Sequence, residues 1–440
     1  MRAPVSGILL ACAALGGIAR AASAQPATAA GEPLQLAALQ REARDADARA
    51  REIALVASQA DLRVRNIDVE RLPAVSALGQ SQYQSDVPTA PFTLPNGQPA
   101  FAPPHFTYDG SLRVDQRLFD PTIDPRRALV RADAAESQAR IRTSLFALRQ
   151  EVNEAFFTSA LLQEQLGALA ASIDDLEARL RETAVRVREG AALAGEAAAV
   201  EASLLRSRQQ ADELRATRAA ALARLSRLTG RSIGPEAATS LPDLAAEVAA
   251  ARSALDAQRA RPEYEQFDRA RDRATRQQDV AAASERPQVS AFGRVGYGRP
   301  GLNFINDRAE TYALGGLQLQ WKAWTWGASA RERDALSIQR EIVTAEESAF
   351  TSGLRRAIEN DLASIDRLRG ALASDDRILE LRDAIDRAAR ARLREGATTA
   401  SDYLDRRTEW LTAQFDRARH RVELAQAQAH LLTTLGLEVR

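Results

Sequence analysis

Residues 182–230 read ETAVRVREGAALAGEAAAVEASLLRSRQQADELRATRAAALARLSRLTG, and residues 389–436 read ARARLREGATTASDYLDRRTEWLTAQFDRARHRVELAQAQAHLLTTLG. Both stretches carry R-x-R-E-G-A near their start and continue as a long run rich in Ala, Arg and Leu. Gly396 follows Gly190 by 206 positions, and Gly436 follows Gly230 by the same interval. The chain therefore contains two copies of one unit of about 200 residues, and such repeats bury their surfaces against one another.

A pair of β-strands is predicted ahead of the helical part of each copy. Residues 106–118, FTYDGSLRVDQRL, place mostly apolar residues at even positions and polar residues at odd positions. This period of two is typical of a strand with one apolar and one polar face. The pattern recurs more weakly at 74–84, and in the second copy at 288–298 and 317–323. We expect four strands of about ten residues, which is the length of strands in outer-membrane barrels.

A very long helical hairpin is predicted after each pair of strands. No proline occurs between Pro125 and Arg188, and at 1.5 Å per residue a helix of this length would extend about 95 Å. Residues 327–394 have the same character. The last run of each copy places apolar residues at intervals of seven, three and four, the pattern of a coiled-coil seam. Residues 34–68 are also predicted to be helical.

The mature chain is expected to contain two repeats and a connector. Residues 1–24 are predicted to be a signal peptide, because Arg2 precedes an apolar run that ends in Ala22-Ser23-Ala24. A lipoprotein signal ending at Cys12, the sole cysteine, is the alternative, and either signal implies export. The predicted parts are a first repeat at 25–230 (β-hairpin 73–119, helical hairpin 125–229), a connector at 231–261, and a second repeat at 262–440 (β-hairpin 287–323, helical hairpin 327–437).

Composition and motifs do not indicate an enzyme. Acidic and basic residues balance at 59 each, so net charge implies no nucleic acid partner. The histidines His105, His420 and His430 are scattered, and the last two are ten positions apart, unlike the i, i+4 spacing of metal ligands on a helix. We therefore expect no catalytic residues, no cofactor and no metal site.

The predicted strands cannot form a closed structure within one chain. Four strands are too few, because the smallest barrels contain about eight. An open sheet edge is not tolerated in hydrocarbon. If these strands lie in a membrane, the barrel must be shared between protomers.

Essentially the whole mature chain resembles the TolC-type outer-membrane efflux proteins. The resemblance rests on the order and duplication of short motifs: RLPAVS at 71–76, LRVDQRLFD at 112–120, the two REGA tips, and the T-G or L-G that closes each half. It implies a mainly α fold with a membrane β-barrel and long antiparallel helical hairpins. In this family a homotrimer contributes four strands per protomer to a shared twelve-stranded barrel.

The resemblance also implies a function. The protein would be a passive exit duct of a tripartite efflux or secretion system, in the outer membrane of a Gram-negative bacterium and extending into the periplasm. Its hairpin tips, at Gly190 and Gly396, would contact a periplasmic adaptor protein that connects to an inner-membrane pump of the RND or ABC type. Outer-membrane lipid would surround the barrel.

Two acidic residues at the start of the last helix are candidates for a periplasmic constriction. Asp402 and Asp405 are three positions apart and would share one helix face, although acids at a helix start are expected from the helix dipole alone. In the family that the chain resembles, two aspartates at these distances after the tip glycine line the entrance as stacked rings. The family's gating Tyr and Arg positions fall on Leu393 and Thr398 here, so the closing contacts must differ.

Two alternatives remain open at this point. A duct for type I protein secretion would have the same sequence pattern as a duct for small-molecule efflux. A periplasmic coiled-coil scaffold or adaptor without a barrel would also contain a helical hairpin. Adaptors, however, have one hairpin flanked by lipoyl-like β segments, whereas this chain has two hairpins, each preceded by an amphipathic strand pair.

Overall fold

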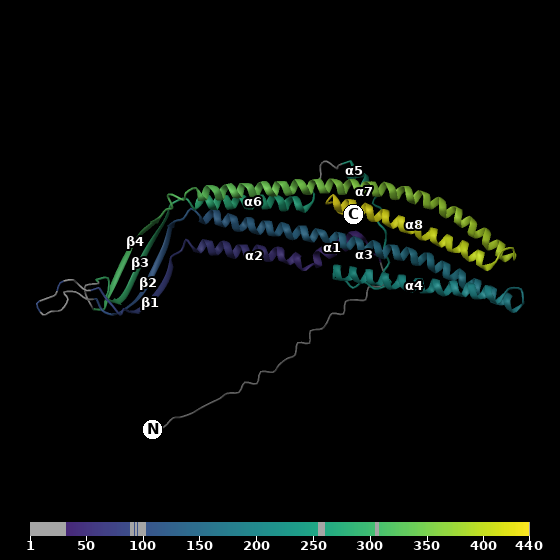
Figure 1. Cartoon of the computed structure of the whole chain (residues 1–440), viewed down its shortest axis with the longest axis horizontal. Helices are drawn as coiled ribbons and strands as arrows, with labels where there is room; N and C mark the ends of the chain where they lie inside the picture. The colour runs from purple at the N-terminus through teal and green to yellow at the C-terminus, as the bar shows by residue number, and fades with distance from the viewer. Residues whose placement is uncertain are drawn as a thin grey trace, which may run out of the picture.

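The structure is a computed structural model, and it describes residues 32–439 except 89–91, 93–94, 96–102, 254–259 and 304–307. The predicted signal peptide, with Cys12, lies outside the described residues, as does much of the loop between the first two strands. The molecule is long and narrow, with a sheet at one end and helices that extend away from it (Figure 1).

The four predicted strands form one antiparallel sheet in the order β1-β2-β3-β4. Their bounds are β1 (Ala74–Tyr83), β2 (Phe106–Phe119), β3 (Gln288–Arg299) and β4 (Glu310–Gln320). The central pair, β2 and β3, comes from different copies of the repeat, and Val114 lies opposite Gly293 in its register. The sheet therefore joins the two halves of the chain.

The helices occupy most of the chain, and equivalent helices of the two copies have nearly equal lengths. They are α1 (Leu36–Ala46), α2 (Ala48–Val69), α3 (Ile123–Arg188), α4 (Ala194–Thr229), α5 (Ala245–Arg252), α6 (Pro262–Ala283), α7 (Ala328–Arg394) and α8 (Ala400–Thr434). With 66 and 67 residues, α3 and α7 are each about 100 Å long. None of the helices in the described part of the chain has the length and apolar content that a membrane-spanning helix needs.

Two hairpins, α3–α4 and α7–α8, run side by side and turn at the end of the molecule farthest from the sheet (Figure 1). Each turn contains a glycine in the left-handed region, Gly190 with φ 75° and Gly396 with φ 71°. Glycine adopts this conformation without the strain that a Cβ atom introduces. The R-E-G-A motif therefore marks the tip of each hairpin.

The expectation of one helix over residues 34–68 is wrong at Leu34 and Gln35, which precede α1, and at Asp47. Asp47 has extended backbone angles, φ −67° and ψ 133°, and separates α1 from α2. Its carboxylate accepts a hydrogen bond of 2.8 Å from the backbone N–H of Arg49, so Asp47 caps the start of α2. The side chain thus supplies a local partner that competes with the continuous helix.

The main hydrophobic core brings together helices from both halves. Phe156 and Phe157 of α3 are 0 % and 1 % exposed and pack edge to face, with ring centroids 5.3 Å apart. Within this core the amide of Gln40 donates to Asn153 at 2.6 Å, and Asn153 donates to Thr433 at 3.3 Å. Because buried polar groups require partners, this chain of hydrogen bonds fixes the relative position of α1, α3 and α8.

The duplicated glycines provide a matched test of backbone crowding. A Cβ atom at Gly436 (φ 80°) would lie 2.8 Å from the carbonyl carbon of Ala260, whereas nothing lies within 4 Å at Gly396. We expect Gly396→Ala to lower the free energy of unfolding by ~1 kcal/mol through backbone strain alone. Gly436→Ala should cost a further ~1–3 kcal/mol, because the chain ahead of α6 must move. Thermal unfolding of the two purified variants is the measurement, and equal midpoints would contradict the close approach.

Candidate functional site: an open two-faced sheet and the hairpin tips

The sheet has one apolar and one polar face, and its register aligns these faces across all four strands. One row across the apolar face consists of Ala77, Leu112, Val295 and Ala313. One row across the opposite face consists of Gln80, Asp109, Gly298 and Glu310. Since side chains alternate along each strand, the period-two pattern in sequence becomes two chemically distinct surfaces.

The apolar face and both sheet edges are open in the single chain. Val75 of β1 is 69 % exposed and Leu317 of β4 is 74 % exposed. β1 and β4 are the edge strands, each hydrogen-bonded to one neighbour in the sheet. An edge strand presents unpaired N–H and C=O groups that can pair with another chain.

The polar face carries a charged network that connects β2, β3 and β4. Arg294 donates to Ser111 at 2.9 Å and to the carboxylate of Asp109, which also accepts from the hydroxyl of Tyr312. The Tyr312 ring lies against Gly296, where a Cβ atom would approach it to 2.5 Å. The missing side chain at Gly296 therefore makes room for the ring.

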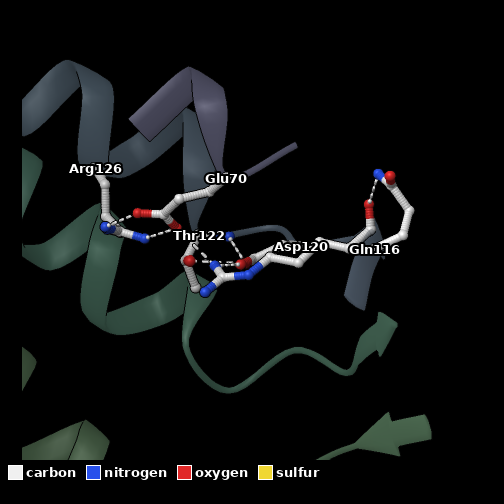
Figure 2. Close-up of polar contacts among 6 residues, drawn as sticks. Glu70, Gln116, Asp120, Thr122 and Arg126 are labelled. Carbon is white, nitrogen blue, oxygen red and sulfur yellow. Dashed lines mark hydrogen bonds and ion pairs between the residues drawn. The ribbon is translucent and has the colours of Figure 1, made fainter. Parts of the chain in front are cut away.

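A second polar cluster fixes the sheet to the helices (Figure 2). Glu70 at the end of α2 accepts two hydrogen bonds of 2.7 Å from Arg126 of α3, and also one of 2.6 Å from Arg117. Asp120 accepts from the backbone N–H and the hydroxyl of Thr122, at 2.9 and 2.7 Å, where β2 passes into α3. The hydrogen bonds from Arg126 are the main cause of a lowered pKa for Glu70. Bidentate pairs of this kind restrict geometry as well as adding attraction, so Glu70 and Arg126 fix α2 against α3. The contact of Arg117 with Glu70 and the turn at Asp120 connect β2 to these helices.

The predicted constriction residues lie near the tip of the α7–α8 hairpin, on the first turns of α8. Asp402 is part of a capping box: the Thr399 hydroxyl accepts from the Asp402 backbone N–H at 3.1 Å, and the Asp402 carboxylate accepts from the Thr399 backbone N–H at 3.4 Å and from the Thr399 hydroxyl at 2.8 Å. The hydrogen bonds from Thr399 are the main cause of a lowered pKa for Asp402, and a hydrogen bond from the Thr398 hydroxyl acts in the same direction. Asp405 is exposed. The carboxylate of Asp402 thus has a local structural role in addition to any role at an entrance.

For Leu393 and Thr398, which the resemblance placed at gating positions, no hydrogen bond or ion pair across the two hairpins is found within the described part of the chain. Leu393 is half-buried, and the Thr398 hydroxyl donates to Asp402 of its own hairpin at 3.2 Å. The contacts that connect the hairpins near their tips come from other residues, which the sequence analysis did not identify.

A buried network joins the first hairpin to the second near the tips. Tyr403 of α8 is 1 % exposed and its hydroxyl donates to Asp175 of α3, which also pairs with Arg390 of α7 at 3.1 Å. Arg390 and Arg407 both pair with Asp386, at 3.1 and 3.5 Å. Tyr403 and Asp175 are 228 positions apart, so no local sequence signal could have paired them.

The three histidines lie apart in the fold and have polar partners of their own. His105 contacts the backbone oxygen of Gln84 at 2.8 Å, His420 pairs with Asp375, and the Nδ1 atom of His430 lies 3.0 Å from Gln150. Among the described residues, no group of three or more His, Cys, Asp or Glu side chains could hold a metal ion.

Comparisons with known proteins identify the fold. The sequence matches no protein-family model, and no curated protein matches it. Among solved structures, the outer-membrane channel OprN is 18 % identical, with a TM-score of 0.64 over 91 % of this chain and 89 % of its own. VceC, an outer membrane protein of Vibrio cholerae, is 14 % identical, with a TM-score of 0.65 over 92 % of this chain and 97 % of its own. The MtrE outer membrane channel of Neisseria gonorrhoeae, in its open state, is 18 % identical, with a TM-score of 0.64 over 92 % of this chain and 89 % of its own.

The chain therefore has the fold of the TolC-type outer-membrane channels, and the resemblance predicted from the sequence is confirmed at the level of the fold. The mainly helical architecture, the four strands and the paired long hairpins all agree with that prediction.

The Tyr403–Asp175 contact predicts a specific pH dependence of stability. Burial, and then the hydrogen bond to Asp175, raises the pKa of Tyr403 from 10.0 to about 12. A raised folded-state pKa stabilises the fold fully below pH 10.0, and this contribution is lost as the pH rises to about 12. The difference in unfolding free energy between wild type and Tyr403→Phe should thus stay constant up to about pH 10 and then fall by ~1–3 kcal/mol.

Chemical denaturation between pH 8 and 12 would test this expectation. Tyr83→Phe, at a tyrosine that is 70 % exposed, controls for the loss of one hydroxyl. A wild-type–Tyr403→Phe difference that is flat across the whole range would show that Tyr403 is not linked to folding.

Proposed function

We propose that the protein is an outer-membrane exit duct that passively conducts substrates delivered from an inner-membrane pump. The observation that carries this proposal is the sheet, which combines an apolar face, a polar face and two open edges. In this proposal the mature chain consists of two repeats, at 25–230 and 262–440, joined by a connector at 231–261. The duct hydrolyses nothing itself, and the pump supplies the energy.

A trimer satisfies the requirements of the sheet. Three copies of four strands make a twelve-stranded barrel, within the size range of outer-membrane barrels. Pairing of β1 with β4 of the next copy removes both edges, which hydrocarbon does not tolerate. The row that contains Leu112 and Val295 would then face lipid, and the row that contains Asp109 and Glu310 would line a water-filled interior.

The helical part has apolar edges that fit the same assembly. On α2, Leu55, Leu62 and Val69 recur at intervals of seven and are 66 %, 60 % and 58 % exposed. On α7, Ile338 and Ile342 are one helical turn apart and are 56 % and 46 % exposed. Apolar residues at these spacings form packing seams between helices, so a neighbouring copy is the partner that we infer for them.

The hairpin tips are proposed to face the periplasm and to contact an adaptor protein at Gly190 and Gly396. Asp402 and Asp405 would then line the periplasmic entrance, six carboxylates in a trimer, and favour cations there. The Tyr403–Asp175–Arg390 network would hold the two hairpins of each protomer together next to this entrance. Efflux of small molecules is the form of this function that we favour, and type I protein secretion is the alternative.

Adjacent residues on β4 test the orientation of the sheet. Leu317 lies on the apolar face and Gln318 on the polar face. Leu317→Arg should destabilise the inserted protein by about 2 kcal/mol and reduce its amount in the outer membrane, because arginine facing lipid is costly. Gln318→Arg should leave the amount unchanged, since it would face water.

Membrane fractionation and native mass spectrometry of both variants and the wild type are the measurements. The wild type should fractionate with the outer membrane and have the mass of a trimer. Recovery of a soluble periplasmic monomer would favour the scaffold alternative, and equal behaviour of the two variants would contradict the assignment of the faces.

The entrance charges can be separated from the capping role of Asp402. Asp402→Asn with Asp405→Asn removes the charges, while the amide introduced in place of the Asp402 carboxylate retains an oxygen that can accept from Thr399. Thr399→Ala disrupts the capping box but keeps both carboxylates. In planar bilayers, the double variant should lose cation preference and block by multivalent cations, because rings of carboxylates set the potential in a narrow mouth. Thr399→Ala should retain both properties. Unchanged selectivity in a double variant that still inserts would restrict the two aspartates to a role at the helix start.

A further inference from the structure

A cavity of about 600 Å³ lies where the first half of the chain meets its last residues. Its lining comes from α1, the start of α2, α3, the residues that begin α6, and residues 436–439. Its volume lies within the ~300–1,000 Å³ typical of small-molecule sites. The residues already assigned to the sheet faces, the tips and the Tyr403 network do not take part in it.

The cavity contains more positive than negative charge. Four arginines line it, Arg41, Arg44, Arg142 and Arg149, against one acidic residue, Glu438. Glu438 is shared, because it lies 2.9 Å from Arg149 and 3.8 Å from Arg44, and Arg44 also pairs at 3.3 Å with Asp45, which is not part of the lining.

The other two arginines, Arg142 and Arg41, have no carboxylate partner in the cavity lining. Arg142 pairs at 3.0 Å with Glu265, which is not part of the lining. Arg41 donates to the backbone oxygen of Ala37 at 3.3 Å and has no carboxylate partner among the residues that the structure describes. At least one guanidinium group is therefore available to a ligand.

Arg149, the least exposed of these arginines, packs against the apolar part of the lining. The Arg149 side chain is 15 % exposed and donates to the backbone oxygen of Leu437 at 3.1 Å. Its guanidinium lies 4.7 Å from the centre of the Phe146 ring, and that of Arg261 lies 4.8 Å from the same ring. Burial above all, with the charge of Arg44 acting in the same direction and Glu438 opposing, lowers the pKa of Arg149. Cationic groups are thus concentrated beside Phe146, Leu145 and Ile53.

We propose that this cavity binds an amphipathic anion, a small molecule with a carboxylate, sulfonate or phosphate group beside an aromatic or short aliphatic body. The anionic group would accept charge-assisted hydrogen bonds from Arg41 and Arg44, and the body would pack against the apolar wall. The cavity is lined by both α1 and the last residues of the chain, so the bound anion would connect the end of the second half to the first.

The first experiment uses naphthalenesulfonate as the probe. It is titrated calorimetrically into the purified full-length protein in lipid nanodiscs, with naphthalenemethanol, the same ring system without the charge, as the comparison. We expect one saturable site per chain for the sulfonate and at least about tenfold weaker binding of the alcohol, because hydrogen bonds to charged groups contribute most of the discrimination. Absence of a saturable site, or equal binding of the two probes, would overturn the proposal.

The second experiment assigns the site. Arg41→Gln combined with Arg44→Gln should weaken sulfonate binding by about tenfold or more through loss of two charge-assisted hydrogen bonds. Arg377→Gln on α7 is the matched control and should bind like wild type. Arg377 does not line the cavity, and it pairs with Glu380 at 2.7 Å. If the double variant does not assemble, Arg41→Gln alone is used, since the hydrogen bond found for that side chain within the described residues goes to a backbone oxygen. Wild-type affinity in the cavity variant would exclude this site.

Discussion

The backbone groups along the two outer strands impose the constraint on which the rest of the structure depends. β1 and β4 each pair with one neighbour, so each has a row of N–H and C=O groups facing away from the sheet. In water such an edge invites association with other chains, and in hydrocarbon it is not tolerated. Copies of the chain related by rotation can supply the missing partners through a head-to-tail contact that closes into a ring. The apolar face, with Leu317 74 % exposed, needs cover for the same reason.

Closure of the sheet would also determine where the long helices lie. A helix of about 100 Å magnifies any error at its base, and a tilt of about 5° there displaces the tip by roughly 9 Å. The sheet–helix junction is therefore the place where the geometry must be rigid. It contains the bidentate ion pair of Glu70 with Arg126 and the turn that Asp120 stabilises. The far end has its own connection, because Tyr403 and Arg390 bind Asp175 across the two hairpins. Fixing both ends limits the movement left to the hairpins.

The sequence allowed the fold to be predicted where local chemistry determines structure. Alternation over residues 106–118 indicated a strand, because this signal acts within a few residues, and the repeated R-E-G-A motif indicated the hairpin tips through the family resemblance. The pairing of β2 with β3 and the Tyr403–Asp175 contact join residues far apart in sequence, and no periodicity reports such partners. The break at Asp47 and the Thr399–Asp402 capping box are local and could have been predicted, since Asp caps α2 and T-x-x-D opens α8. The cavity beside Phe146 depends on five segments of the chain, so it appears only in the folded chain.

The two aspartates at the start of α8 show how a structural contact can prepare a functional one. Hydrogen bonds from Thr399 and Thr398 hold the Asp402 carboxylate in place and lower its pKa. Asp405 is exposed, and no hydrogen bond to its side chain is found within the described residues. In the proposed trimer, one ring of carboxylates would thus be fixed by the helix cap, whereas the other would be free to move toward a passing cation. The cap of Asp402 and its position at an entrance are therefore compatible, because a carboxylate already oriented by its own helix needs no further ordering to act on ions in the mouth.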